Sequence, residues 1–370
     1  MVFSSITFLY IFLPVVLILY YIVPRGCRNI VLLISSLIFY FFGEPVYTLL
    51  LIFSSVSDYL HSLYIEKHRG TKRGKTALIS SIIINIGMLA VFKYTDFLLA
   101  SINSIFDLSI PMTGIKLPIG ISFFTFQTMS YTIDVYRGNV HAQKNIISLA
   151  TFVCLFPQLI AGPIVRYTDI NEELTSRRSG SEDISYGIRR FIVGLSKKVF
   201  IANAMGELCS LILKSQTQTV LNSWMYAIGY TLQIYYDFSG YSDMAIGLGR
   251  MFGFHFPENF NYPYISRSVT EFWRRWHMTL GGWFRDYLYI PLGGNRTGRI
   301  KWVRNILIVW FLTGLWHGAS VNFILWGLMY GILLLLEKLF WGKILEKLPR
   351  ILQTIYTMFF VIVGFVILVK

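Results

Sequence analysis

Two histidines lie in surroundings that suit acid–base chemistry, and the first is His317. It follows Trp316 in the segment 312–320, between two apolar runs of the 370-residue sequence. An ionisable side chain at such depth is costly, so it is a functional candidate by default. The alternative is a buried histidine bonded to a backbone carbonyl. The pattern favours chemistry, because imidazole has a pKa near neutral pH and can serve as a general base.

The second histidine, His277, precedes His317 by 40 residues and is crowded by tryptophans and arginines. Arg274, Arg275 and Trp276 are typical of a membrane interface, where His277 would be one residue of an aromatic belt. No serine or cysteine nucleophile motif accompanies either histidine, which indicates direct transfer by general-base catalysis. The remaining histidines lie in polar or interfacial segments: His61, His68, His141 and His255.

Two carboxylates, Asp237 and Asp243, lie beside a predicted membrane span. They could orient a histidine, bind a cation or pair with arginines; pairing is favoured, and neither is assigned as catalytic. The three cysteines are far apart and form no ligand pattern, so we expect no metal site. No Walker loop or dinucleotide-binding glycine pattern occurs, so we expect no bound cofactor.

The composition predicts an integral membrane protein. Of the residues, 55% are hydrophobic and 14% charged, whereas a soluble domain carries about 25% charged residues. Lipid must therefore cover part of the surface. The net charge of +14 comes from short basic segments between apolar runs, which is typical of cytoplasmic loops beside anionic headgroups. We expect the lipid bilayer, and no nucleic acid, as partner.

A helix needs about 20 apolar residues to cross a bilayer. The first apolar run, 6–23, has no basic segment before it and no cleavage site after it, so we expect a membrane helix and no cleaved signal. The predicted spans are 6–23, 29–42, 46–59, 77–92, 224–236, 305–315, 322–336 and 355–369.

Two apolar segments, 117–124 and 156–163, are broken by proline and glycine. Irregular backbone at membrane depth persists only when it is buried in protein or lines a wet cavity. These segments are therefore re-entrant elements around a central site, or else ordinary loops at the membrane surface; both alternatives stay open. Residues 184–199 carry apolar side chains at helical spacing among basic ones, which predicts an amphipathic helix on the cytoplasmic face.

The basic loop 61–76 sets the predicted topology. Five basic residues oppose Glu66, so this loop should be cytoplasmic and the N-terminus outside. Arg25 and Arg28 then also lie inside. No repeat or long linker is found, which predicts one domain, 1–370. The five basic residues are Lys67, Arg69, Lys72, Arg73 and Lys75.

Long stretches carry a family resemblance: 117–127, 130–138, 156–166, 232–250, 260–264, 271–296 and 310–318. They resemble the membrane-bound O-acyltransferase family, most closely its bacterial alginate O-acetyltransferase-like branch. The resemblance implies an all-α polytopic fold, with a ring of transmembrane helices and short re-entrant or interfacial helices around a central tunnel. It also implies that His317 is catalytic and that His277 occupies a second position, His or Asn in the family. The expected substrate-binding residues are Trp316, Trp276, Arg274, Arg275, Asp237 and Asp243.

The activity that this resemblance implies is acyl transfer, with acetyl the expected group, at the plasma membrane. The donor would be a cytoplasmic thioester, acetyl-CoA or an acyl carrier protein. The acceptor would be an extracellular polysaccharide, reached directly or through an extracytoplasmic acyltransferase partner. The alternatives are D-alanyl transfer to teichoic acid, a membrane transporter of a cell-envelope precursor, and a non-catalytic scaffold.

Two departures from the resemblance are visible. Val321 stands where relatives often have tryptophan, which would reshape the pocket. The chain stops at Lys370, just after an apolar run, where polysaccharide-modifying relatives continue, so we expect that it is shortened at the C-terminus.

A basic collar precedes His317. In 267–304, only Glu271 and Asp286 oppose eight basic side chains, a balance that would attract an anionic donor. His317 lies twelve residues beyond Asn305, roughly 18 Å along a helix at 1.5 Å per residue. We therefore expect both histidines to share a polar tunnel open to the cytoplasm. The collar consists of Arg267, Arg274, Arg275, Arg285, Arg296, Arg299, Lys301 and Arg304.

Overall fold

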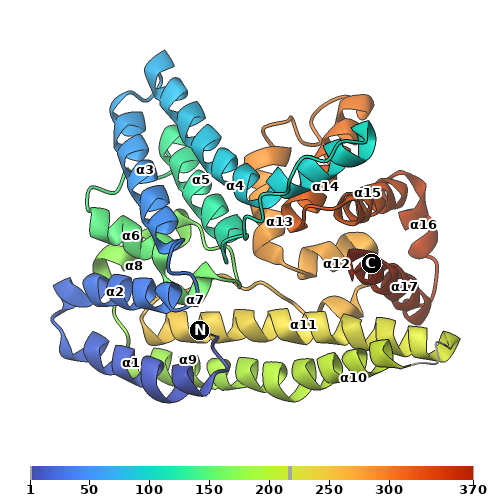
Figure 1. Cartoon of the computed structure of the whole chain (residues 1–370), viewed down its shortest axis with the longest axis horizontal. Helices are drawn as coiled ribbons and strands as arrows, with labels where there is room; N and C mark the ends of the chain where they lie inside the picture. The colour runs from blue at the N-terminus through green and yellow to red at the C-terminus, as the bar shows by residue number, and fades with distance from the viewer. Residues whose placement is uncertain (1, 216–218, 370) are drawn as a thin grey trace. The chain divides into compact units, whose positions relative to one another are not determined.

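The computed structural model describes residues 2–215 and 219–369. Met1 and Lys370, the ends of the predicted domain, lie outside the described residues. All regular elements in the described ranges are helices, which confirms the all-α prediction (Figure 1). The chain divides into two compact units: Met1–Leu195 with Asp243–Pro257, and Ser196–Ser242 with Glu258–Lys370. The single domain 1–370 stays a prediction.

The first unit is built around three long helices, α3, α4 and α5, which contact one another (Figure 1). The short helix α6 contacts α2, α3, α5 and α8. The helices of this unit are α1 (Leu13–Ile22), α2 (Arg28–Phe41), α3 (Thr48–Lys67), α4 (Lys72–Phe106), α5 (Ile121–Arg137), α6 (Ile146–Cys154), α7 (Phe156–Leu159), α8 (Tyr167–Ser176) and α9 (Ser181–Ser196), preceded by the π-helix η1 (Phe8–Phe12).

The two broken segments meet within the first unit. Gly120 has φ +80°, and a Cβ there would lie 2.5 Å from the carbonyl oxygen of Leu159, so only glycine fits. All four residues of α7 are buried, so Phe156–Leu159 is not an ordinary surface loop, and its re-entrant character stays a prediction. Leu117 and Ile119 are exposed, Pro118 between them is buried, and α5 begins at the buried Ile121.

The second unit carries both candidate histidines. Helix α11 (Val220–Met251) is continuous, with its residues to Ser242 in this unit and those from Asp243 in the first. The other elements are η3 (Lys197–Ala202), α10 (Asn203–Lys214), α12 (Val269–Arg275), α13 (Met278–Phe284), η5 (Arg285–Tyr289), α14 (Arg299–His317), α15 (Val321–Leu336), η6 (Glu337–Trp341), α16 (Gly342–Leu345) and α17 (Arg350–Val369).

Helices α14 and α15 form a tight hairpin. A Cβ at Gly314 would lie 2.3 Å from the carbonyl oxygen of Phe323, and one at Gly327 would lie 2.3 Å from that of Trp310. A Cβ at Gly318 would meet the Phe323 ring. The small residues around His317 thus let another helix approach closely, as their sequence predicts.

Four described helices are long and apolar enough to cross a membrane. They are Thr48–Lys67, Lys72–Phe106, Val321–Leu345 and Arg350–Leu368, and Phe8–Ile22 is a shorter apolar helix. The predicted spans 224–236 and 305–315 lie within α11 and α14, which meet the helix prediction but are not among the four. Residues 184–199 lie in the helical run of α9 and η3, as predicted.

Candidate functional site

His277 connects two short helices, α12 and α13. Its backbone has φ +45°, a left-handed conformation in which asparagine, aspartate and histidine are the favoured side chains other than glycine. Helix α12 begins at a cap in which Ser268 Oγ accepts a hydrogen bond from the Glu271 amide at 3.0 Å. The residue is only 2% exposed, so the turn buries the imidazole instead of presenting it to an interface.

Asn259 fixes the ring of His277. Its side-chain oxygen lies 3.0 Å from His277 Nδ1, and it also accepts from the Thr279 hydroxyl at 2.9 Å and the Thr279 amide at 3.4 Å. Because a backbone amide can only donate, the Asn259 atom facing these groups is the carbonyl oxygen. A neutral His277 therefore carries its proton on Nδ1, and Nε2 is the basic nitrogen.

His317 is the last residue of α14, and tryptophans hold it from two sides. Its ring lies edge-on to Trp326 of α15, with centroids 4.7 Å apart, and 5.0 Å from the ring of Trp316. The Trp316 ring is also 6.1 Å from His277. His277 lies outside the candidate membrane helices; burial, and after it the charge of His317, hold its pKa well below the usual range. The two imidazoles are thus close enough to interact.

A cavity of about 190 Å³ (space open to the centre of a water-sized sphere) lies beside His277. Its wall includes Val309, Trp310 and Thr313 of α14, and Thr313 lies one turn before His317. His317 itself is beyond the wall of this cavity. Most lining side chains are aliphatic or aromatic, and the charged ones are Arg285 and Lys338. A polar tunnel shared by both histidines was predicted. This cavity is instead mainly apolar, and of the two histidines it is bordered by His277 alone.

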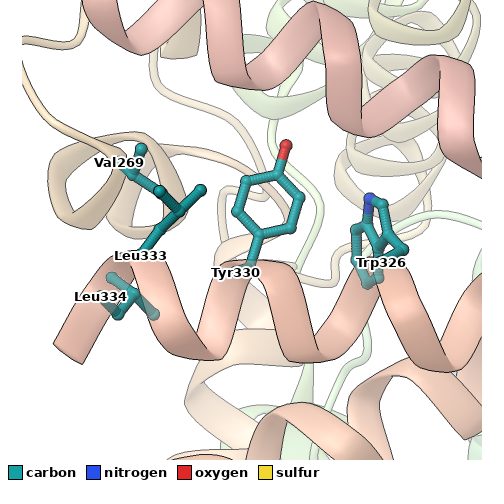
Figure 2. Packing of buried hydrophobic residues seen from close by; sticks show 5 residues of the cluster. All are labelled: Val269, Trp326, Tyr330, Leu333 and Leu334. Carbon is teal, nitrogen blue, oxygen red and sulfur yellow. The ribbon is translucent and has the colours of Figure 1, made fainter. Parts of the chain in front are cut away.

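A cluster of aromatic rings packs next to the candidate histidines. The indole of Trp273 contacts Trp310, Trp326 and Tyr330 at centroid distances of 4.9, 5.5 and 4.9 Å. Figure 2 shows the side chains of Trp326 and Tyr330 projecting from α15 on the side of Val269, the first residue of α12. Trp326 is 1% exposed, and its indole nitrogen has no acceptor among the described residues. An indole N–H beside His317 is therefore a candidate hydrogen-bond donor to a substrate.

Glu337 ties the same helical run to His277. Its carboxylate accepts from the amides of Val269 and Thr270 at 2.7 and 2.8 Å, and from the Thr270 hydroxyl at 2.6 Å. These amides form the N-terminus of α12, whose positive dipole end favours a carboxylate. The helical run of α15 and η6 thus contacts His317 through Trp326 and anchors the helix that leads into His277.

The other predicted substrate-binding residues fall into two groups, buried tryptophans and arginines outside the buried turn. Trp276 is 4% and Trp316 7% exposed, and both belong to the aromatic packing around His277. Arg274 is exposed, and Arg275 pairs with Glu271 at 2.9 Å. These arginines lie on α12, before the buried turn.

Both aspartates are paired. Asp243, in the first unit, bonds Arg190 at 2.7 Å, which confirms the favoured arginine pairing. Asp237, in the second unit, bonds Lys198 at 2.7 Å, so its partner is a lysine instead of an arginine. In residues 2–215 and 219–369, no three His, Cys, Asp or Glu side chains gather as metal ligands.

Sequence reasoning passed over Asn259, Trp326 and Glu337. Glu337 carried a usable signal, because a lone acid follows the apolar run of α15 and an acid at that depth is a functional candidate by default. Trp326 lay in the same run without distinction from its apolar neighbours. Asn259 lies 18 residues before His277, and only the fold brings the two together.

Comparison with known proteins adds a family to this geometry. The model of MBOAT, the membrane-bound O-acyltransferase family, matches residues 141–367. Over 372 residues, the chain is 44% identical to a probable alginate O-acetylase of Pseudomonas aeruginosa, with 99% of this chain and 72% of that protein covered.

More distant relatives act on other envelope polymers, to judge by their names. A peptidoglycan O-acetyltransferase of Helicobacter pylori is 34% identical over 402 residues, which cover 99% of this chain and 76% of that protein. A teichoic acid D-alanyltransferase of Bacillus subtilis is 32% identical over 268 residues, which cover 67% of this chain and 68% of that protein.

Proposed function

We propose that this chain, which belongs to the membrane-bound O-acyltransferase family, moves an acetyl group from a cytoplasmic thioester toward hydroxyls of an extracellular polysaccharide. The family model and the named O-acetyltransferase relatives make it a membrane protein and an O-acyltransferase. The observation that carries the proposal is the pair of histidines whose rings both pack against Trp316, one of which lines an apolar cavity.

In the proposed reaction, His317 is the general base. It takes the proton of a sugar hydroxyl while that oxygen attacks the carbonyl carbon of the thioester. The carbon–sulfur bond then breaks, the new carbon–oxygen bond remains, and the imidazolium returns the proton to the leaving thiolate. Proton transfer of this kind contributes about 10²–10⁴-fold to a rate.

The tautomer of His277 determines whether this residue can donate or accept a proton in the reaction. Its Nδ1–H donates to Asn259, so neutral Nε2 accepts a proton and does not donate one to a carbonyl. We therefore assign His277 to proton transfer within the pair, and carbonyl polarisation to a donor nearer His317. The buried indole N–H of Trp326 fits that task, because a fixed donor in a water-poor site stabilises a developing oxyanion.

We propose that the donor enters from the collar. Arg285 and Lys338 border the cavity, and the helical path from Asn305 to His317 rises roughly 18 Å at 1.5 Å per residue. A phosphopantetheine arm is about that long, so its thioester would reach the histidines while its phosphates remain among arginines. This geometry suits acetyl-CoA and an acyl carrier protein equally.

The acceptor assignment comes from the relatives. The alginate O-acetylase match covers 99% of this chain at 44% identity, and the D-alanyltransferase match covers 67% at 32%. We therefore place an extracellular polysaccharide first, reached directly or through an extracytoplasmic partner, and teichoic acid second. Membership in an acyltransferase family disfavours the transporter and scaffold alternatives.

We further propose a multi-pass plasma membrane protein with its N-terminus outside, on the strength of the basic loop 61–76. A cysteine introduced at Arg69 should react with an impermeant thiol reagent only from the cytoplasmic side. Labelling of intact cells would invert this topology.

The deciding experiment measures acetyl-CoA consumption and ester formation by purified protein in detergent. His317→Ala should abolish both, and His277→Ala should reduce both strongly. The matched control is His141→Ala, because the His141 side chain is 95% exposed and bonds Glu66 on the surface. Near-normal turnover by the His317 variant would refute the mechanism. If the protein consumes a thioester only when the donor is a D-alanyl carrier protein, the teichoic acid alternative is correct.

A further inference from the structure

A second, polar cavity lies in the first unit, and its residues take no part in the proposed chemistry. Its volume is about 490 Å³ on the same measure as before, and it lies between the start of α2, the start of α6 and the end of α8. Four arginines border it, and none of its lining residues is acidic. They are Arg25, Arg28, Arg177 and Arg178.

One of these arginines is fixed in place by neutral groups. Arg177 donates to the side-chain oxygens of Asn29 at 2.6 Å and Tyr20 at 2.9 Å, and to the carbonyl oxygen of Phe252 at 3.1 Å. Asn29 is in turn held by bonds to Ser148 and to the carbonyl oxygen of Leu174. The guanidinium is therefore held in position, but these bonds do not neutralise its charge.

The cavity leaves arginine donors without acceptors. Arg177 Nη2 and Arg28 Nε are both buried and have no hydrogen-bond partner among the described residues. Burial lowers the pKa of Arg177, Tyr20 and the Glu173 carboxylate raise it, and the charge of Arg28 lowers it again, so the two guanidinium groups repel each other. An anion in the cavity would satisfy the donors and relieve the repulsion.

The helix beside the cavity offers an apolar track. Ile30, Ile34, Ile38 and Phe41 recur at helical spacing on one face of α2, roughly 120° around the helix from Arg28, and all four are exposed by 40–55%. From Ile30 to Phe41 the track rises about 16 Å at 1.5 Å per residue, which is roughly half of a 30 Å hydrocarbon core. A ligand with a charged end in the cavity and a chain along this track has the dimensions of one lipid in one leaflet.

We infer that this cavity binds the phosphodiester headgroup of an anionic phospholipid, whose acyl chains run along the exposed face of α2. Inorganic phosphate has the same anionic chemistry, but it has no use for the apolar track. The inference is independent of the acyl transfer proposed above, because the histidines and their cavity belong to the second unit.

Native mass spectrometry of the whole protein tests this binding, after reconstitution into nanodiscs of phosphatidylglycerol or of phosphatidylcholine. The wild type should retain phosphatidylglycerol on release into detergent. Arg28→Gln should lower the retained fraction about fivefold, because a basic side chain near a membrane contributes about 1 kcal/mol to anionic lipid binding. Arg25→Gln with Arg178→Gln, on two exposed residues, should act in the same direction without disturbing the core.

The matched control removes two other basic charges of the first unit, Lys72→Gln with Arg73→Gln, and should retain phosphatidylglycerol like the wild type. Equal retention by all variants would overturn the inference. Thermal stabilisation by inorganic phosphate in phosphatidylcholine nanodiscs, lost in Arg28→Gln, would assign the cavity to a soluble phosphate and overturn the lipid assignment. Neither measurement depends on acetyl transfer.

Discussion

Two buried polar sites show how differently this chain treats ionisable groups inside apolar helices. In the first unit, Asp58 of α3 is 1% exposed and accepts from the Ser81 hydroxyl at 2.7 Å and the Asn85 amide at 2.8 Å. Asn85 accepts in turn from Thr128 at 3.0 Å. Every member of this group comes from α3, α4 or α5, so the group links the three central helices of its unit.

The second unit arranges its histidines otherwise. Asn259 anchors the His277 ring, which borders a cavity. His317 packs against aromatic rings at the end of a helix. Burial is therefore insufficient evidence for chemistry, since Asp58 and His277 are both almost fully buried. The difference is that the hydrogen bonds of Asp58 are made within the protein, whereas the imidazole of His277 meets open space.

The largest effect that this comparison predicts concerns the rate of acetyl transfer. His317→Ala should lower turnover by about 10²–10⁴-fold, the usual contribution of a general base. Asp58→Asn should turn over at a rate close to that of the wild type, measured per folded molecule by product formation. An Asp58→Asn enzyme as inactive as His317→Ala would mean that the polar group of the first unit takes part in chemistry.

A nearly equal effect is expected at the indole beside His317. Trp326→Phe keeps an aromatic ring but removes the N–H, so kcat should fall by about 10²–10³-fold, as when an oxyanion donor is lost. The KM for the donor should change little, because the N–H acts on the transition state. Trp302→Phe, on a partly exposed tryptophan at the start of α14, is the control. A raised KM with unchanged kcat would instead give Trp326 a binding role.

The largest loss of folding stability is expected from a change at Asp58, in the first unit. Asp58→Ala leaves the Ser81 hydroxyl and the Asn85 amide buried without their acceptor, which costs about 2–6 kcal/mol in the free energy of unfolding at about 1–3 kcal/mol per group. Unfolding by SDS in mixed micelles measures this cost. Asp96→Ala removes a partly exposed aspartate of α4, which bonds the segment after that helix, and should be much milder. Equal losses would show that the Asp58 group is not a structural link.

The use of the cavity can be tested apart from the histidines. Gly281 lines it, and a Cβ there would meet nothing closer than 3.9 Å, so the backbone position admits a side chain and Gly281→Leu should fill part of the 190 Å³. We expect the KM for acetyl-CoA to rise about tenfold, equivalent to about 1.4 kcal/mol of binding. Gly87→Leu on α4, where a Cβ meets nothing within 4 Å, is the matched control. Unchanged kinetics would mean that the donor does not use this cavity.

The comparison also marks what the sequence could predict. The apolar helices and the tight α14–α15 hairpin follow from composition and from Gly314 and Gly318, because hydrophobic length and small residues act locally. The importance of His317 followed from its depth and from family resemblance, and that of His277 from the resemblance alone. The geometry of the pair could not be predicted, since it depends on Trp316 and Asn259 arriving from distant segments.

The resemblance places histidine or asparagine at position 277, and the structure supplies a physical reason. A residue with φ +45° that must also bond Asn259 suits only a few side chains, and both histidine and asparagine are among them. In contrast, the wall of the cavity was predicted to be polar and is largely apolar. Charge counting along 267–304 could not foresee this, because Arg275 and Arg285 are each paired with an acid.

The smallest expected effect is a pH dependence of stability. The folded protein holds the pKa of His277 well below the usual value of about 6.5, chiefly through burial and then through His317. As pH falls below about 6.5, the unfolded chain therefore binds a proton that the folded chain refuses, and stability declines by at most about 1.4 kcal/mol per pH unit until the folded pKa is reached. Above that window the contribution is fully present.

His277→Asn suits the left-handed backbone and cannot titrate, so its unfolding midpoint in detergent should fall less than that of the wild type between pH 7 and pH 5. His141→Asn, at an exposed position, should keep the wild-type slope. Parallel curves for the wild type and the His277 variant would show that His277 takes up its proton equally in the folded and unfolded states. Burial would then not control the protonation of His277, which the proposed proton transfer within the pair requires.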